Sequence, residues 1–230
     1  MLAVLLIVMF ACLILGFPMF MSMVLSSTVS VLVYLPQLPS NTIIQQLMGG
    51  VSSFALLAIP LFIFAADIMS SGHTATRLVD LMKAFIGHIH GGLGATMACT
   101  CTLFGAISGS TQATVVAIGK TMRPNMLKAG YRDEDINGLI VASANIAMFI
   151  PPSVAMIMYC VVTGTSVGEM FVAGIAPGVV LCVLFCLYTH FHSKKLDVPR
   201  TQKTTWAERG QALKKAILPL GFPVVIVGSI

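Results

Sequence analysis

The segment from Gly91 to Thr121 is an apolar run, rich in small residues, that a polar stretch containing glycine interrupts near its middle. Each half has about 15 residues, whereas a helix that spans a bilayer needs about 20. Basic residues flank both ends, and loops rich in lysine and arginine stay on the cytoplasmic side of a membrane. A segment that enters and leaves on one side is a re-entrant hairpin. The sequence therefore predicts such a helical hairpin over 91–121, with its tip near residues 108–110.

The composition and the positions of the charges support a membrane protein. Of 230 residues, 57% are hydrophobic and only 9% are charged, which is typical of a polytopic helical membrane protein. The net charge of +5 could indicate nucleic-acid binding, but no charged residue precedes Asp67. All thirteen lysines and arginines lie in three short segments between apolar runs, as the positive-inside rule describes. We therefore expect the lipid bilayer as a partner and no nucleic acid.

The apolar runs predict an all-α fold whose chain starts outside the cytoplasm. The first run lacks a basic leader region and a clear cleavage site, so we interpret it as a retained helix. Two shorter helices are expected at membrane surfaces, over 43–48 and 73–90. The six cysteines lack the spacing of a zinc site and are interpreted as buried free thiols. The predicted membrane-spanning helices are 2–15, 20–35, 54–69, 136–162 and 169–191, in addition to the hairpin.

The span over 136–162 contains the sequence Ile150-Pro-Pro-Ser153, which should break the helix. Two prolines remove two backbone donors and leave carbonyl groups unpaired one turn earlier. Lipid offers no partner for such groups, so the break must lie inside protein or beside a cavity. A broken hairpin followed by a broken helix is the arrangement from which transporters build ion and solute sites.

The hairpin tip and the broken helix supply the candidate site residues. Small ions with hard character prefer oxygen ligands, which carbonyl, hydroxyl and amide groups provide without bulk. The glycine at the tip permits backbone shapes that bring carbonyls together. Asp67 falls near a span end, and we expect it close to the inner surface in a solvated or paired structural role. The predicted ligands of a sodium ion are Ser108, Gly109, Ser110 and Asn145, and the predicted solute contacts are Thr111 and Ser153.

An intramembrane serine hydrolase is the alternative from a different functional class. Ser108 would be its nucleophile, but Ala106 stands where a rhomboid-type pattern has glycine. No histidine lies mid-span to act as the base that a serine nucleophile needs. We therefore expect no enzymatic activity. A purely structural subunit is disfavoured because the two broken elements expose backbone that only a site or a cavity would justify.

Several motifs resemble the large membrane subunit of TRAP (tripartite ATP-independent periplasmic) transporters. They follow the family order over most of the chain and correspond to the first half of a typical member. Two departures are Thr111-Gln112, where many members have a small residue and proline, and Asn145, where threonine is expected. The matching motifs are Leu57-Ala-Ile-Pro-Leu-Phe62, Gly87-His88 with Gly91-Gly92, Phe104-Gly-Ala-Ile-Ser-Gly-Ser110, Gly130-Tyr131, Ile150-Pro-Pro-Ser153 and Phe171-Val-Ala-Gly-Ile-Ala-Pro-Gly178.

The resemblance implies sodium-driven import of an acidic solute such as a C4-dicarboxylate, sialic acid or a sugar acid. It implies a bacterial inner-membrane location, an elevator motion, a small membrane subunit and a periplasmic binding protein as partners, and sodium as coupling ion without another cofactor. Another sodium-coupled anion symporter of similar fold is the alternative. The implied organisation is scaffold and interfacial arm helices in 1–90 and half of a transport domain in 91–192. A cytoplasmic linker and the start of a truncated second repeat would occupy 193–230.

Overall fold

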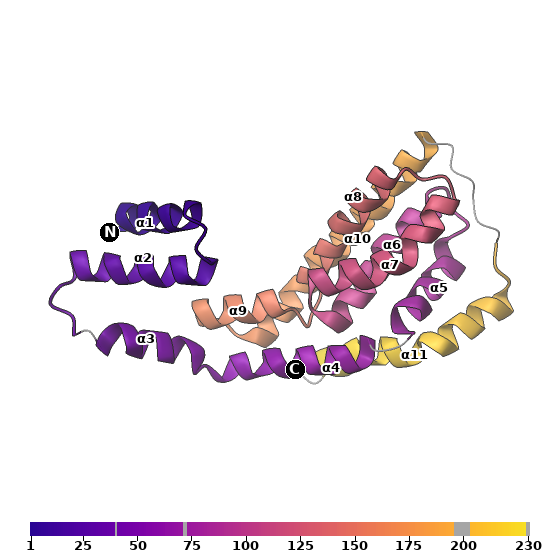
Figure 1. Cartoon of the computed structure of the whole chain (residues 1–230). Helices are drawn as coiled ribbons and strands as arrows, with labels where there is room; N and C mark the ends of the chain where they lie inside the picture. Colours follow the sequence, from indigo (N-terminus) through magenta and orange to yellow (C-terminus); the bar gives the residue numbers. More distant parts are fainter. Residues whose placement is uncertain (40, 71–72, 196–202, 229–230) are drawn as a thin grey trace. The chain divides into compact units, whose positions relative to one another are not determined.

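The computed structural model describes residues 1–39, 41–70, 73–195 and 203–228, and these form helices without strands (Figure 1). The predicted all-α fold is confirmed. The chain divides into two compact units, Met1–Ser53 and Phe54–Ile230. The division into scaffold, transport half and linker that the resemblance implies stays a prediction. Residues 71–72, 196–202 and 229–230, which include much of the predicted linker, lie outside the described residues.

The first unit contains the helices α1 (Leu2–Ile14), α2 (Met19–Tyr34) and α3 (Asn41–Val51). Helices α1 and α2 pack against each other, and every described α1 side chain stays at least partly exposed. Three serines spaced four residues apart form the buried stripe of α2. The first two, Ser22 and Ser26, donate hydrogen bonds to backbone carbonyls of their own helical segment. Small side chains that bond back to their own backbone let two apolar helices approach closely.

The second unit is built around a helical hairpin, which confirms the hairpin predicted over 91–121. Helix α6 (Gly92–Ser108) runs to a turn at Gly109 and Ser110, and α7 (Thr111–Lys128) returns beside it. Helix α7 extends seven residues beyond the predicted end. The hairpin shares a buried cluster with α5 (Thr74–Ile86) and α8 (Asp133–Ala144), so the hairpin forms the core of this unit. The largest fully buried side chains of that cluster include Leu78, Met97, Phe104, Ile107, Ile118, Met122, Met126 and Ile136.

The predicted break after the hairpin is present and is longer than expected. Helix α8 (Asp133–Ala144) continues into the 3-10 turn η2 (Asn145–Met148), and α9 (Val154–Thr163) begins only after both prolines. The amide of Phe149 donates to the carbonyl of Ile146, which ends the helical run before the prolines are reached. The hydrogen-bonding pattern therefore changes one turn upstream of the residues that cause the break.

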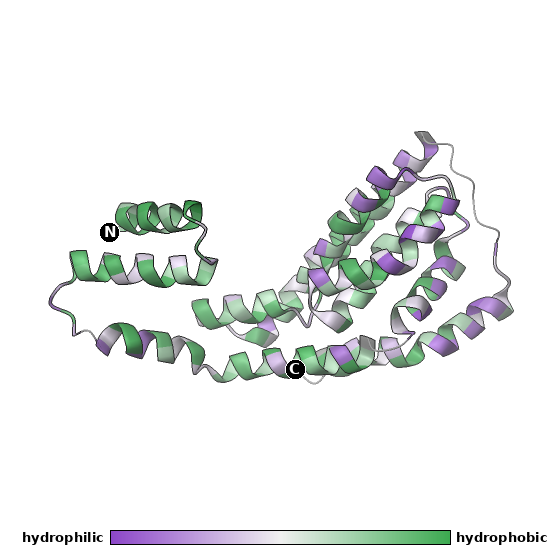
Figure 2. Ribbon diagram, viewed as in Figure 1, coloured by the Kyte–Doolittle hydropathy of each residue, from purple (hydrophilic) through white to green (hydrophobic). Residues whose placement is uncertain are grey.

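Helix α10 (Val167–Lys195) is the one described helix that is by itself long and apolar enough to cross a membrane. The middle of α10 has a hydrophobic colour in Figure 2, whereas its C-terminal end is hydrophilic; the shorter helix α1 is hydrophobic throughout. Large apolar side chains of α10, such as Val172, Leu184 and Phe191, remain well exposed. An exposed apolar helix surface of this length is what a lipid-facing helix presents. The 3-10 turn η1 (Phe54–Leu57) and α4 (Ala58–Ser70) cover the segment 54–69, whose crossing of the membrane stays a prediction.

One predicted boundary needs correction, and one surface prediction stays a prediction. Helix α5 (Thr74–Ile86), which the sequence predicts at the inner membrane surface, packs one face against α6, α7 and α11 (Trp206–Gly228), so that Leu78 and Leu81 are buried. Helix α11 (Trp206–Gly228) begins ten residues before the predicted apolar segment at 216, within the predicted linker. Arg209 explains the early start: it donates to the carbonyl of Ala84 and its guanidinium lies over the rings of Phe85 and Trp206. The start of α11, which has charged residues of both signs, is therefore helical because it packs against α5.

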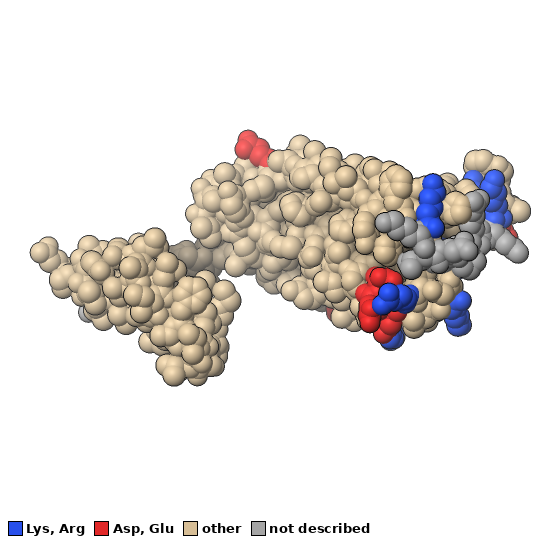
Figure 3. All heavy atoms as spheres, turned by 90° about the horizontal axis from the view of Figure 1, so that it is seen from above, with Lys and Arg blue, Asp and Glu red and all other residues tan. Residues whose placement is uncertain are grey.

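The basic side chains gather at one end of the second unit, as Figure 3 shows. This grouping agrees with the predicted inner side for the chain between α7 and α8. There Arg123 donates two hydrogen bonds to the carboxylate of Asp133, at 2.8 and 2.9 Å. The Arg123 guanidinium holds the pKa of Asp133 below its usual value. Both side chains are well exposed, so the pair orients the connection more than it stabilises the fold.

The contact between α6 and α10 contains three of the six cysteines. The Sγ atom of Cys99 lies 3.8 Å from that of Cys182 and 3.6 Å from that of Cys186. All six cysteines are free, as predicted, but only Cys101 and Cys160 are fully buried. The sequence spacing did not suggest the cluster, because Cys99 is far along the chain from the other two. We interpret the three thiols as small apolar groups at a helix–helix contact.

Candidate functional site

A cavity of about 600 Å³ opens beside the hairpin tip, within the second unit. This volume is in the range of cavities that hold small molecules. The hairpin, the 3-10 turn η2, the start of α9 and helix α4 all contribute walls. The lining residues are Ile63, Ala66, Asp67, Ser108, Gly109, Ser110, Thr111, Gln112, Ala113, Asn145, Met148, Val154 and Ala155.

Four helix ends meet at this cavity. Ser108 is the last residue of α6 and Met148 the last of η2, whereas Thr111 is the first residue of α7 and Val154 the first of α9. Helix C-termini present unpaired carbonyls and attract cations, and helix N-termini present unpaired amides and attract anions. The cavity therefore offers favourable surroundings for ions of both signs, supplied by the backbone.

The turn at Gly109 fits tightly against the proline break. Gly109 has a φ of +60°, a conformation that favours glycine. A Cβ atom at this position would lie 2.6 Å from the carbonyl oxygen of Pro152. The amide of Val154 donates to the Gly109 carbonyl at 3.4 Å. The tip therefore contacts the start of α9 directly, and a movement of one element would displace the other.

The hydroxyl groups of the tip hold the turn together. The Oγ atom of Ser108 accepts a hydrogen bond from the Ser110 amide at 3.4 Å and lies 3.2 Å from Oγ1 of Thr114. The Oγ atom of Ser110 accepts from the Ala113 amide, which caps α7, and donates to Oε1 of Gln112 at 3.1 Å. The serine oxygens can bind an ion only if these hydrogen bonds rearrange or if the oxygens use their remaining lone pairs.

The structure brings five of the six predicted site residues to the cavity. Ser108, Gly109, Ser110, Thr111 and Asn145 all line it. Asn145 lies at the start of η2 with its side chain exposed, which leaves the amide oxygen accessible. The Oγ1 atom of Thr111 is buried and has no hydrogen-bond partner among the residues that the structure describes. Their assignment as ion and solute ligands stays a prediction.

Ser153, the sixth predicted residue, lies elsewhere. It is fully buried at the N-cap position of α9 and is not among the residues that line the cavity. Its Oγ atom has no hydrogen-bond partner within the part of the chain that the structure describes. The hydroxyl therefore belongs to the packing behind the tip, and a direct solute contact is not supported by its position.

The sequence analysis did not anticipate that Asp67 lines this cavity, whose wall it joins through α4. The predicted solvated or paired role near the inner surface stays a prediction. The Asp67 side chain is exposed. The missed signal was the position of Asp67 within an apolar helix, because an ionisable residue inside a membrane segment usually marks a functional site.

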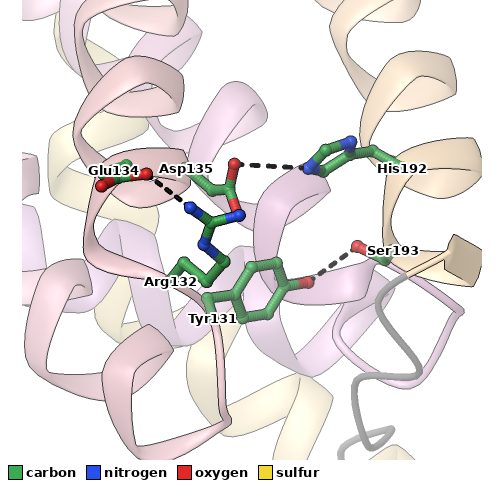
Figure 4. A network of polar contacts seen from close by, with 6 residues as sticks. All are labelled: Tyr131, Arg132, Glu134, Asp135, His192 and Ser193. Atoms are coloured by element: carbon green, nitrogen blue, oxygen red, sulfur yellow. Dashed lines mark hydrogen bonds and ion pairs between the residues drawn. The ribbon is translucent and has the colours of Figure 1, made fainter.

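A second cavity, of about 380 Å³, lies between α8 and α10 at the basic end of the unit. Figure 4 shows the polar contacts beside it. The hydroxyl of Tyr131 lies 2.9 Å from that of Ser193, and His192 lies 3.6 Å from Asp135. The neighbouring pair Arg132 and Glu134 is exposed. These contacts join the start of α8 to the end of α10 across the predicted cytoplasmic side. None of the predicted site residues lies here.

The family described as "Tripartite ATP-independent periplasmic transporter, DctM component" matches residues 6–230. The chain belongs to this family. The resemblance inferred from the motifs is thereby confirmed, and the DctM family consists of membrane transporter components. The match includes every helix that forms the tip cavity.

The names of relatives within the DctM family specify different solutes. The chain is 48% identical, over 95% of its length, to the ectoine/5-hydroxyectoine TRAP transporter large permease protein UehC of Ruegeria pomeroyi. It is 49% identical, over 95%, to the ectoine TRAP transporter large permease protein TeaC of Halomonas elongata. It is 35% identical, over 94%, to the C4-dicarboxylate TRAP transporter large permease protein DctM of Rhodobacter capsulatus. The chain spans about half the length of these relatives, 51%, 51% and 52% respectively.

The comparisons bear on the hydrolase alternative. The names of these relatives describe transporter permeases and no enzyme. Ser108, the nucleophile of that alternative, is engaged with Ser110 and Thr114. No histidine is among the described residues that line the tip cavity. The geometry at Ser108 is that of a helix end and not of an activated serine.

Proposed function

We propose that this chain forms part of the solute path of a sodium-driven TRAP permease in the bacterial inner membrane. A periplasmic binding protein delivers the solute and a small membrane subunit completes the assembly. The meeting of four helix ends at one cavity carries the proposal, because it provides for a cation and an anionic group side by side. Family membership supports the transporter role, and the basic end of the unit supports a cytoplasmic side there.

Sodium would bind among the oxygen atoms of the tip and of η2. The ligands are the carbonyl groups at the ends of α6 and η2, the hydroxyls of Ser108 and Ser110, and the amide oxygen of Asn145. Gly109 lets the α6 end and the α7 start lie close enough to share one ion. Hard cations favour this set of oxygen ligands.

The solute carries a carboxylate, which would lie at the starts of α7 and α9. Ectoines, C4-dicarboxylates and sialic acid, which appear in the names of relatives, all possess a carboxylate group. The positive ends of two helix dipoles are suited to such a group, although the Val154 and Ala113 amides already have partners within the tip. Sodium bound at the neighbouring helix C-termini would close the tip over the solute, which couples the two by a shared geometry. The tip and broken helix would move together as the elevator part.

Uptake into proteoliposomes tests this proposal. The full-length permease, its small subunit and its binding protein should accumulate radiolabelled solute when an inward sodium gradient is imposed. Asn145→Leu removes one oxygen ligand and should raise the sodium concentration that gives half-maximal uptake about tenfold, as the loss of a charge-assisted contact would do. The measurement is the initial uptake rate against sodium concentration.

The control replaces sodium by potassium at equal ionic strength, which leaves the membrane and the binding protein unchanged. Solute accumulation that is equally fast without sodium would remove sodium from the mechanism. An unchanged sodium dependence in Asn145→Leu, together with sodium-driven uptake, would move the ion site away from η2.

A further inference from the structure

The tip cavity contains a charge that neither a sodium site nor a carboxylate site at the helix starts requires. Asp67 is the one side chain with a formal charge among the described residues that line the cavity. Its carboxylate is exposed and belongs to α4, whereas the starts of α7 and α9 belong to other walls. The cavity thus has a negative group on one wall and helix N-termini on two others.

This distribution of charge discriminates between classes of solute. A compound with negative charges alone would be attracted by the helix starts and repelled by Asp67. A compound with positive charge alone would be repelled by the positive dipole ends at the starts of α7 and α9. A zwitterion, with a carboxylate and a cationic nitrogen group, satisfies both walls. A cavity of about 600 Å³ has room for a solute of that kind beside an ion.

We infer that Asp67 is a specificity-determining residue that binds the cationic group of a zwitterionic solute, whose carboxylate lies at the starts of α7 and α9. The inference rests on the proposed function and adds the class of solute to it. Gln112, in the first turn of α7, adds a neutral polar side chain to the lining of the cavity. The two relatives named for ectoine transport fit this class, because ectoine is a zwitterion.

Equilibrium binding of radiolabelled ectoine tests the inference. It is measured on the full-length permease with its small subunit, at fixed saturating sodium, with succinate as the competing dianion. The wild-type protein should bind ectoine more tightly than succinate. Asp67→Asn keeps the shape but removes the charge, so ectoine should bind about tenfold more weakly. Succinate should bind more tightly than before, because the repulsion is gone.

Two further variants separate charge from folding. Asp67→Glu keeps the charge and should retain the preference for ectoine. Glu169→Gln makes the same change of carboxylate to amide at an exposed position outside the cavity, and both affinities should stay unchanged. If Asp67→Asn does not fold, Asp67→Glu decides alone, and loss of the preference for ectoine in that variant would contradict the inference.

The possible outcomes have distinct meanings. Sodium-driven uptake of succinate by a wild-type protein that binds no ectoine would overturn the inference and leave the proposed function standing. Parallel weakening of both solutes in Asp67→Asn, with a raised sodium requirement, would also overturn it and make Asp67 a sodium ligand. Failure of sodium-driven uptake for every solute would instead contradict the proposed function.

Discussion

Replacement of Gly109 by valine should abolish solute uptake while the protein still inserts into the membrane. Gly109 has a φ of +60°, which costs a residue with a side chain about 1–2 kcal/mol. The added Cβ would lie 2.6 Å from the Pro152 carbonyl oxygen, so the tip would have to move away from the start of α9. Overpacking of that kind costs about 1–3 kcal/mol more. The measurement is uptake by the full transporter, normalised to the amount of permease in the vesicles.

Gly164→Val is the matched control for this variant. Gly164 has a similar positive φ of +71°, but a Cβ there meets no atom within 4 Å. It therefore carries the conformational cost without the clash, and uptake should remain close to that of the wild type. Equal loss of uptake in both variants would show that backbone strain alone is responsible and that contact between the tip and the proline break is unimportant.

Gly105→Val should separate the hairpin from η2 and lower both stability and uptake. A Cβ at Gly105 would lie 2.6 Å from the Cα and from the Cβ of Ala147. Both partners are buried, and backbone atoms cannot move aside as a flexible side chain can. We expect a loss of about 1–3 kcal/mol of stability and a displaced Asn145. Thermal unfolding in detergent, followed by uptake measurements, checks both effects.

Gly138→Val provides the comparison within a helix. Gly138 belongs to α8, and a Cβ there would have nothing within 4 Å. The substitution makes the same change in helix propensity as Gly105→Val, from glycine to a β-branched residue. Its unfolding temperature should stay near that of the wild type. If Gly105→Val were as stable and as active as Gly138→Val, close packing of α6 on η2 would not be needed for the site.

The hairpin and the broken helix could be predicted because strong local signals determine them. Basic residues on both sides of 91–121 indicated a chain reversal, and Gly109 with its flanking serines marked the turn. The paired prolines at 151 and 152 defined the second break. Both elements place their polar ends at one cavity, so five predicted residues came together without any long-range information.

The parts that the sequence did not reveal depend on contacts between distant segments. Asp67 reaches the cavity because α4 lies beside α6 and α9, which no local pattern near Asp67 indicates. The early start of α11 depends on Arg209, whose partners Ala84 and Phe85 lie in α5. The partners of the apolar face of α5 could not be predicted either, because its periodicity does not distinguish packing on α6, α7 and α11 from contact with lipid.

Sodium and solute together occupy the tip cavity in the proposed mechanism. Gln112 lines the cavity with an exposed side chain and is suited to a test by thiol labelling. Gln112→Cys is introduced into full-length permease whose native cysteines are replaced, and its reaction rate with a polar maleimide is measured. Sodium should slow labelling, and sodium with solute should slow it further, whereas potassium should not. Lys128→Cys, at the far end of α7, should react at one rate in all conditions. Labelling of Gln112→Cys that is equally fast with and without sodium and solute would contradict the account.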